Sequence, residues 1–339
     1  MRIGSYTYRG FILSIITFCI SSSFTNATPE FKNVSLKSIS PLTTENSLKP
    51  YQSDRLRSFG YIPSSYTRNS SAPPPQSPMS IDIPHLPSKF DLSENLPPVG
   101  DQGRQNSCVS WVCAYYMKSY QEAREHHWSY DESSHRMSPS FLYNQLQSND
   151  EGSTFPETFD VLIQQGCASQ ATLPYRDTDF SWPSAQAYKE AIPYRALSFE
   201  YLGEGTTSKI FTTIKAALVS GDLVAVGIPI YRSARLSPGQ FESLDENSFT
   251  YDLPSESEVI VAGYHAVTLC GYDESMFDGY GGYKIVNSWG TGWGQKGYAW
   301  LSERFLSTYG MEIYRMKDRI DYQPTSLVHW KFSHTFWGW

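Results

Sequence analysis

The sequence has few of the residues that build disulfides or metal sites. Five cysteines are spread over 339 residues, whereas a secreted fold held together by disulfides usually has more of them at closer spacing. Their spacing to histidine matches no zinc motif. We therefore expect no metal and no cofactor. The apolar content of 40% is large enough to build a core for one large or two ordinary domains.

Positive charge and long apolar runs are also scarce. The net charge is −7, and no basic cluster offers a surface for nucleic acid or an anionic membrane. The apolar run at 11–20 is too short to span a membrane comfortably. It follows Arg2 and Arg9 and precedes a small, polar stretch. This pattern predicts a cleaved signal peptide at 1–27 and a secreted or periplasmic monomer that leaves the membrane after cleavage.

Residues 28–84 are rich in serine, proline, threonine and asparagine, with Pro73-Pro-Pro near the middle. Such a composition cannot bury a core and is typical of a linker or a pro-segment. Two short stretches, Tyr61-Ile-Pro and Ser80-Ile-Asp-Ile, carry apolar side chains that are able to dock elsewhere.

A cysteine follows a glycine-rich turn and opens an apolar helical pattern. Apolar residues then recur with helical spacing as far as Tyr120, which predicts a helix from Cys108 to about 127 with Ser107 or Asn106 as its cap. The dipole of a helix favours a thiolate in its first turn. Gln102 supplies an amide donor six residues upstream. Taken alone, however, such a cysteine is more often a structural core residue.

Two downstream segments change that interpretation. Gly-Tyr-His265-Ala-Val-Thr predicts a strand with a histidine near its start, and Asn287-Ser-Trp289-Gly-Thr-Gly-Trp-Gly predicts a strand end followed by a turn. The three segments, in this order, resemble the papain-like cysteine peptidases of the C1 family. Val109 follows the cysteine where most relatives have tryptophan, as in the divergent bacterial-type subgroup.

This resemblance implies an α+β, two-lobe papain-like fold. We expect a peptidase domain at 85–320, with a helical lobe at about 101–221 and an antiparallel β-barrel lobe at about 222–318. The active site would lie in the cleft between the lobes. Residues 321–339 form an aromatic-rich tail. Local patterns add helices at 138–146, 155–165 and about 208–220, and strands at 223–230, 264–271, 283–289 and 297–301.

The resemblance also assigns chemical roles to residues. Cys108 would be the nucleophile of an endopeptidase that forms a thioester, and His265 its general base and acid. Asn287 would orient the imidazole, while Trp289 shields their hydrogen bond from water. Gln102 and the backbone N–H of Cys108 would form the oxyanion hole. The partner is then a protein or peptide substrate.

Substrate-binding positions follow from the same comparison. Relatives have a Gly-Gly pair that binds the substrate backbone, of which only Gly152 remains. Gly227 and Gly263 replace bulkier apolar residues in the pocket for the side chain preceding the scissile residue, and Tyr264 stands just before the histidine. We therefore expect that pocket to accept a large apolar or aromatic side chain.

Several alternatives stay open. Relatives carry a cysteine at the position of Gln105 that forms a disulfide, and the sequence does not say whether Cys113, Cys167 and Cys270 pair. The same site would also serve an exopeptidase or a peptide ligase. A catalytically silent member of the family would only bind peptides or a partner protein. Residues 28–84 would either restrain the enzyme or act as a solvated spacer.

Overall fold

The computed structural model describes residues 58–64, 85–146, 149–233, 249–253 and 259–319, all of which belong to one unit, 51–339. The predicted signal peptide, the Ser80-Ile-Asp-Ile stretch and the C-terminal tail lie outside these residues. The helices are α1 (Cys108–Ser110), η3 (Trp111–Lys118), α2 (Ser119–His126), α3 (Pro139–Leu146), α4 (Phe155–Gln164), α5 (Ala185–Ala191), α6 (Ile210–Val219) and α7 (Glu303–Tyr309). Single 3₁₀ turns are η2 (Ser93–Asn95), η4 (Ser133–His135), η5 (Ile192–Tyr194) and η6 (Phe277–Gly279).

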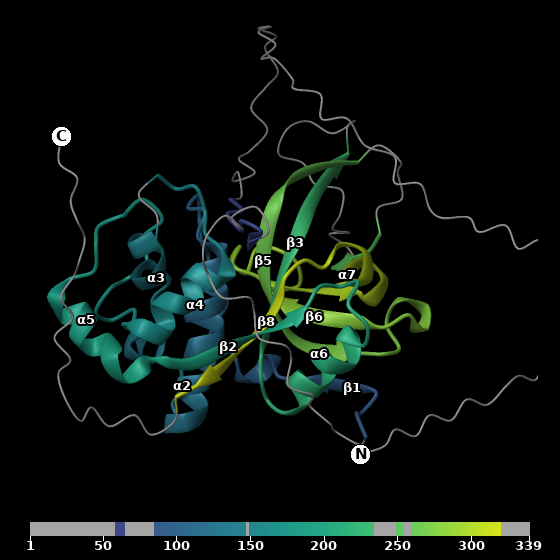
Figure 1. The fold of residues 1–339 in the computed structure, drawn as a ribbon, viewed down its shortest axis with the longest axis horizontal. Coiled ribbons are helices and arrows are strands. Elements are labelled where there is room, and N and C mark those ends of the chain that lie inside the picture. The colour runs from purple at the N-terminus through teal and green to yellow at the C-terminus, as the bar shows by residue number, and fades with distance from the viewer. Residues whose placement is uncertain (1–57, 65–84, 147–148, 234–248, 254–258, 320–339) are drawn as a thin grey trace, which may run out of the picture. The chain divides into compact units, whose positions relative to one another are not determined.

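The strands form one sheet of eight. They are β1 (Lys89–Asp91), β2 (Ala196–Gly203), β3 (Val224–Ser233), β4 (Thr250–Tyr251), β5 (Val259–Asp273), β6 (Gly282–Val286), β7 (Tyr298–Ser302) and β8 (Ile313–Asp318). Their order is β2-β8-β3-β5-β6-β7-β4, with β1 paired to β5. All pairs are antiparallel except β4 with β7. Figure 1 shows α2 to α5 on one side of this unit and most of the sheet, with α6 and α7, on the other.

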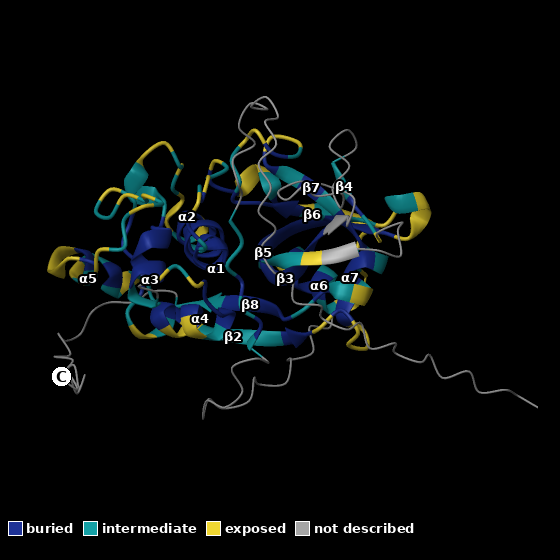
Figure 2. Ribbon diagram, turned by 90° about the horizontal axis from the view of Figure 1, so that it is seen from above, coloured by how far each residue is buried: buried dark blue, intermediate teal, exposed yellow. Residues whose placement is uncertain are grey.

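The helix predicted from Cys108 is present as the continuous run α1-η3-α2. It ends at His127, which adopts the left-handed conformation with φ 54°. Its middle turns, η3, are π-helical, which the sequence pattern did not indicate. Residues 108–120 are all buried, so the helix is enclosed on every side and not along one stripe. Figure 2 shows it in dark blue at the centre of the fold.

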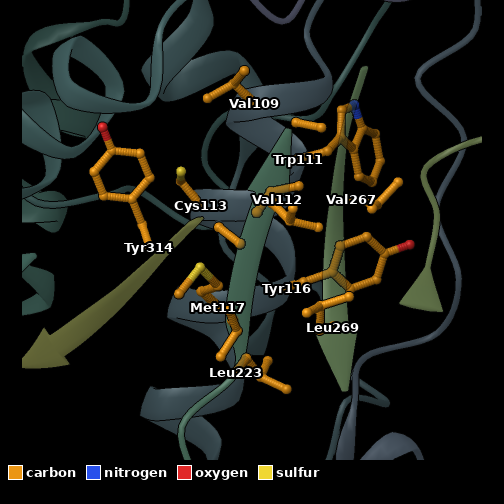
Figure 3. Packing of buried hydrophobic residues seen from close by; sticks show 14 of the residues in the cluster. Val109, Trp111, Val112, Cys113, Tyr116, Met117, Leu223, Val267, Leu269 and Tyr314 are labelled. Carbon is orange, nitrogen blue, oxygen red and sulfur yellow. The ribbon is translucent and has the colours of Figure 1, made fainter. Parts of the chain in front are cut away.

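This central helix packs against strands β3 and β5 of the sheet. Side chains of Val112 and Tyr116 face those of Val267 and Leu269 on β5, and Tyr314 on β8 lies near Cys113 (Figure 3). These side chains are almost completely buried, and their burial stabilises the packing of the helix against the sheet. The first residue of the helix is therefore held rigidly next to the sheet.

Other predicted helices are confirmed with small differences. Thr154 and Glu157 form a capping box at the start of α4, and Pro139 begins α3. The helix expected at about 208–220 begins at Ile210 as α6, and Lys209, in the left-handed conformation, precedes it without a side-chain cap. Thr207 and Ser208, the capping residues that the sequence suggests, therefore do not cap it. The Thr207 hydroxyl instead accepts from the Glu204 backbone N–H.

The strand predictions identified β3, β5, β6 and β7 but missed β1, β2, β4 and β8. β2 and β8 pair across more than 100 residues of sequence, from Phe199↔Met316 to Tyr201↔Tyr314. Long-range pairing of this kind leaves little local signal. β2 thus joins the sheet although it comes from the part of the chain predicted as the helical lobe. The lobe boundaries themselves remain a prediction.

No disulfide joins the cysteines of the described chain. Cys108, Cys113, Cys167 and Cys270 are all free and buried, which answers the pairing question left open by the sequence. Within the same residues, no helix is long and apolar enough to cross a membrane.

Candidate active site

Cys108 lies at the first position of α1, as predicted, but neither expected side chain caps the helix. Ser107 occupies the N-cap position without a capping hydrogen bond, and its hydroxyl pairs with the Tyr175 hydroxyl at 2.8 Å. Asn106 donates its side-chain amide to the Asp150 carbonyl at 2.7 Å and its backbone N–H to the Asp150 carboxylate at 2.8 Å. The turn before Cys108 is therefore tied to a neighbouring loop instead of to its own helix.

The Cys108 thiol is completely buried against strand β5. The backbone N–H of Ala266, the residue after His265, lies 3.4 Å from Sγ. Burial raises the pKa of the Cys108 thiol to about 12, while backbone N–H groups of Ala266, Val109, Cys108 and Tyr61 lower it. With residues 58–64 in place, the environment thus favours the protonated thiol. The low thiol pKa that the helix dipole would favour at Cys108 does not hold in this form, in which residues 58–64 cover the thiol.

His265 and Asn287 meet as predicted. His265 Nε2 and Asn287 Oδ1 are 2.7 Å apart, and the Ser288 backbone N–H donates to the same oxygen at 2.7 Å. Because an amide oxygen only accepts, Nε2 must carry the proton in the neutral ring. Trp289 stacks on the imidazole with centroids 4.4 Å apart and 27° between the planes, and this covers the hydrogen bond.

Gln102 is held in one orientation by the same loop. The Ser288 hydroxyl donates to Gln102 Oε1 at 2.6 Å, and the Gln102 backbone N–H donates to the Ser288 carbonyl at 2.8 Å. The side-chain Nε2 therefore points away from Ser288. It lies 3.3 Å from the carbonyl oxygens of both Ser58 and Phe59, and 2.9 Å from that of Gln105.

Residues 58–64, here called the covering segment, lie across this site and contact Gln102, Cys108, His265 and Trp289. The Trp289 indole N–H donates to the Ser58 carbonyl at 3.2 Å. Ser153 pairs with the segment in a parallel bridge, through Ser153 N–H to Gly60 O at 2.8 Å and Ile62 N–H to Ser153 O at 3.0 Å. Gly60 has φ 111°, and a Cβ there would lie 2.0 Å from the Asn106 carbonyl oxygen. Glycine is thus required for the segment to pass Asn106.

Each predicted substrate-binding position contacts the covering segment. A Cβ at Gly152 would lie 2.3 Å from Gly60 O, and the Tyr264 carbonyl accepts from the Tyr61 N–H at 3.2 Å. Cβ atoms at Gly227 and Gly263 would lie 2.1 Å from the Tyr61 ring and 2.7 Å from the Phe59 ring, respectively. Gly227 therefore makes room for the Tyr61 side chain, and Gly263 makes room for that of Phe59.

Three residues of this region were missed by the sequence. Ser153, not Gly152, forms backbone hydrogen bonds with the segment. Ser288 orients both Gln102 and Asn287. Glu312 accepts a hydrogen bond from the Tyr61 hydroxyl at 2.7 Å. Ser288 stands inside the recognised Asn-Ser-Trp block, so a signal was available. Glu312 lies directly before β8, and its place depends on a long-range strand pair that no local pattern indicates.

One group of metal-ligand type occurs in the described chain, away from the segment. Glu122, Glu125 and His126 have ligand atoms within 4.8 Å of one another. Glu122 already pairs with the buried Lys118 at 2.5 Å and with His126 at 3.2 Å. These ion pairs account for the cluster, and we assign no metal to it.

Comparison with known proteins adds a sequence match and several similar folds. Residues 86–317 match the sequence profile of the papain family cysteine proteases, whereas a comparison with curated protein sequences finds no match. The structure is similar to xylellain, a cysteine protease from Xylella fastidiosa, with a TM-score of 0.59, 24% identity, and coverage of 80% of this chain and 100% of xylellain.

Two further solved structures resemble it. Procathepsin B S9 from Trypanosoma congolense has a TM-score of 0.56 and 17% identity, with 78% of this chain and 87% of that chain covered. The bromelain protease from Ananas comosus, solved with the inhibitor E64, has a TM-score of 0.52 and 16% identity, with 69% and 100% covered. At these identities the likeness concerns the fold alone.

Proposed function

Because the chain belongs to the papain family of cysteine proteases, we propose that it is an exported endopeptidase that hydrolyses peptide bonds through a thioester on Cys108. The observation that carries this proposal is the covering segment. It is a stretch of polypeptide that lies over Cys108, with two carbonyl oxygens within 3.3 Å of Gln102 Nε2. A site that accommodates peptide backbone in this way suits peptide bond chemistry.

We assign one role to each group. Cys108 Sγ bonds to the substrate carbonyl carbon while its proton passes to His265, and Gln102 Nε2 and the Cys108 N–H donate to the oxyanion. The C–N bond then breaks, His265 gives the proton to the leaving amine, and a thioester remains. Water, losing a proton to His265, attacks that thioester and releases the acid and the thiol. Asn287 keeps the imidazole oriented throughout.

Endopeptidase action fits the path of the covering segment better than exopeptidase action does. The segment enters at Ser58 and leaves at Ser64, so the chain continues in both directions and neither chain end lies at Cys108. A site for chain ends would need a group that blocks one side and binds a terminal charge. Because the segment continues on both sides of the site, we favour cleavage within a substrate chain over cleavage at its ends.

The covering segment itself runs in the non-productive direction. The leaving amine takes its proton from His265, so the C-terminal half of a substrate must lie on the side of His265 and Trp289. In the covering segment that side holds Phe59, whose ring centroid is 6.4 Å from His265 and 6.1 Å from Trp289, and Tyr61 follows it. We infer that the segment restrains the enzyme without being a good substrate, and that it is not merely a spacer.

Thiol labelling tests the enzyme against the silent peptide-binding alternative. After limited proteolysis of the preceding residues, an epoxide warhead at neutral pH should label Cys108 once per molecule and abolish peptide hydrolysis. Cys108→Ala should lose both, whereas Cys270→Ala, which removes another buried free thiol, should keep both. Absence of labelling and hydrolysis would leave the silent binding module as the better interpretation.

Three substrate formats separate the remaining alternatives. A peptide blocked at both ends is cut by an endopeptidase but not by an exopeptidase, and an added amine nucleophile reveals ligation. Export is tested separately, because the N-terminal sequence of the secreted protein should begin near residue 28. A protein that retains residues 1–27 inside the cell would contradict export but not proteolysis.

A further inference from the structure

Asp150 joins the loop before the nucleophile to the loop that holds the covering segment. Its Oδ1 accepts from the Asn106 backbone N–H at 2.8 Å and from the Tyr143 hydroxyl at 2.7 Å. The Asp150 backbone carbonyl accepts from the Asn106 side-chain amide at 2.7 Å. The Tyr143 hydroxyl in turn accepts from the Gly152 backbone N–H at 3.3 Å. A continuous set of hydrogen bonds therefore runs from Asn106 to Gly152.

Both ends of this set contact the covering segment. A side chain on Gly60 would collide with the Asn106 carbonyl. On the other side, the Ser153 N–H donates to Gly60 O at 2.8 Å, and Ser153 O accepts from the Ile62 N–H at 3.0 Å. Gly60 thus touches both stretches of backbone, and Asp150 fixes the position of one relative to the other.

Tyr143 is suited to hold the Gly152 end. Its side chain is buried in α3. Burial, followed by the hydrogen bond to Asp150, raises the pKa of Tyr143. The phenol therefore keeps its proton and donates it to Asp150, which leaves the phenol oxygen able to accept from Gly152.

The nucleophile has a support that does not involve Asp150. The Ser107 hydroxyl pairs with that of Tyr175 at 2.8 Å, and Cys108 begins a helix that is buried along most of its length. By contrast, the backbone groups of Ser153 bond to the covering segment in this form, so they become available to a substrate when the segment leaves. Loss of the Asp150 side chain should therefore weaken peptide binding more than it slows the chemical steps.

We propose that Asp150 is a positioning residue for peptide binding. Through Asn106 and Tyr143 it sets the distance between the loop before Cys108 and the backbone of Ser153, and it touches no reacting atom. This inference rests on the proposed peptidase function. It extends that function from the reacting groups to the two stretches of backbone between which a peptide is held.

The first test separates binding from chemistry. In the full chain activated by limited proteolysis, Asp150→Ala should raise KM for a peptide about tenfold and change kcat by less than about twofold. Asp150→Asn should recover most of the affinity, because its Oδ1 can accept both hydrogen bonds and asparagine tolerates the φ of 57° found at this position.

Two controls accompany these variants. Asp150→Gly suits the positive φ but lacks the side chain, so it should raise KM as Asp150→Ala does. Asp131→Ala removes an exposed aspartate that accepts from the Ser129 hydroxyl in another loop, and it should leave KM and kcat unchanged.

A second measurement does not require catalysis. In the full chain carrying Cys108→Ala, Asp150→Ala should speed hydrogen exchange of the Ile62 amide about tenfold, because its acceptor, the Ser153 carbonyl, is held less firmly. Amides of β5 should keep their protection, which would show that the fold is intact. In a Tyr143→Phe background, Asp150→Ala should have a smaller effect, because one of its two contacts is already lost.

The outcomes separate the two proposals. An unaltered KM in Asp150→Ala, or a fall in kcat alone, would overturn the positioning role even in an active enzyme. If Asp150→Gly keeps the affinity that Asp150→Ala loses, backbone strain explains the loss and the role is overturned as well. If the activated chain cleaves no peptide but Ile62 exchange depends on Asp150, the peptidase proposal fails and Asp150 still positions the bound segment. If neither is observed, both proposals fail.

Discussion

Removing the Tyr61 side chain should release the enzyme from its covering segment. Tyr61→Ala deletes a buried aromatic ring together with a hydrogen bond to a carboxylate. Truncating a fully buried aromatic residue costs about 3–5 kcal/mol, and even the low end is roughly a hundredfold change in an equilibrium. A segment docked about 99% of the time would then be docked about half of the time.

The assay is hydrolysis of a small peptide by the full chain at equal concentrations of titrated active sites. Tyr61→Ala should be many times faster than the unaltered chain and should approach the rate of enzyme trimmed near Leu86. Tyr280→Ala, which removes a tyrosine that is 61% exposed, should not accelerate hydrolysis. If the unaltered chain, Tyr61→Ala and the trimmed enzyme all cleave at the same rate, the segment is a spacer and the reasoning is refuted.

Three further predictions concern the catalytic groups and the core. Burial raises the pKa of the Cys108 thiol to about 12, so alkylation of the full chain should be slow at pH 7 and rise with pH. Trimming should shift the profile to well below pH 8.5, and His265→Ala should reverse part of that shift. Gln102→Ala should lower kcat by about 10²–10³ with little change in KM, measured by steady-state kinetics. Lys118→Met should remove the buried ammonium that pairs with the Glu122 carboxylate and lower the free energy of unfolding by about 3–5 kcal/mol, measured in urea.

Each of these has an outcome that contradicts it. Identical alkylation profiles before and after trimming would mean that the segment does not control the thiol, and no effect of His265→Ala would remove that residue from its role. A rise in KM alone for Gln102→Ala would indicate substrate binding in place of oxyanion stabilisation. Unchanged stability of Lys118→Met would show that Glu122 is protonated or hydrated in the folded state.

Local sequence signals predicted the elements that carry the candidate site. The helix of Cys108, helix α4 and the core of β5 follow from periodicity, which depends on residues close together in the sequence. The family's three-segment pattern then pointed to the residues that meet there. His265 and Asn287 lie together, as that pattern implied.

What could not be predicted depends on contacts between distant residues. Glu312 reaches Tyr61 across 251 positions, and its backbone pairs with Gly227 on β3. The side chains expected to cap the helix instead find partners on other loops, because those partners, Asp150 and Tyr175, were not placed by any local pattern.

The hydrogen bonds around Asn106 have a consequence for the redox chemistry of this protein. Where relatives brace the loop before the nucleophile with a disulfide, this chain uses Asp150, which also accepts from the Tyr143 hydroxyl at 2.7 Å. A thiol enzyme with such a disulfide needs an oxidant to form the disulfide and a reductant to keep its catalytic thiol free. Here the hydrogen bonds that hold the loop involve no sulfur and the described cysteines are all free, so a reductant that keeps the Cys108 thiol free would not loosen the loop before it.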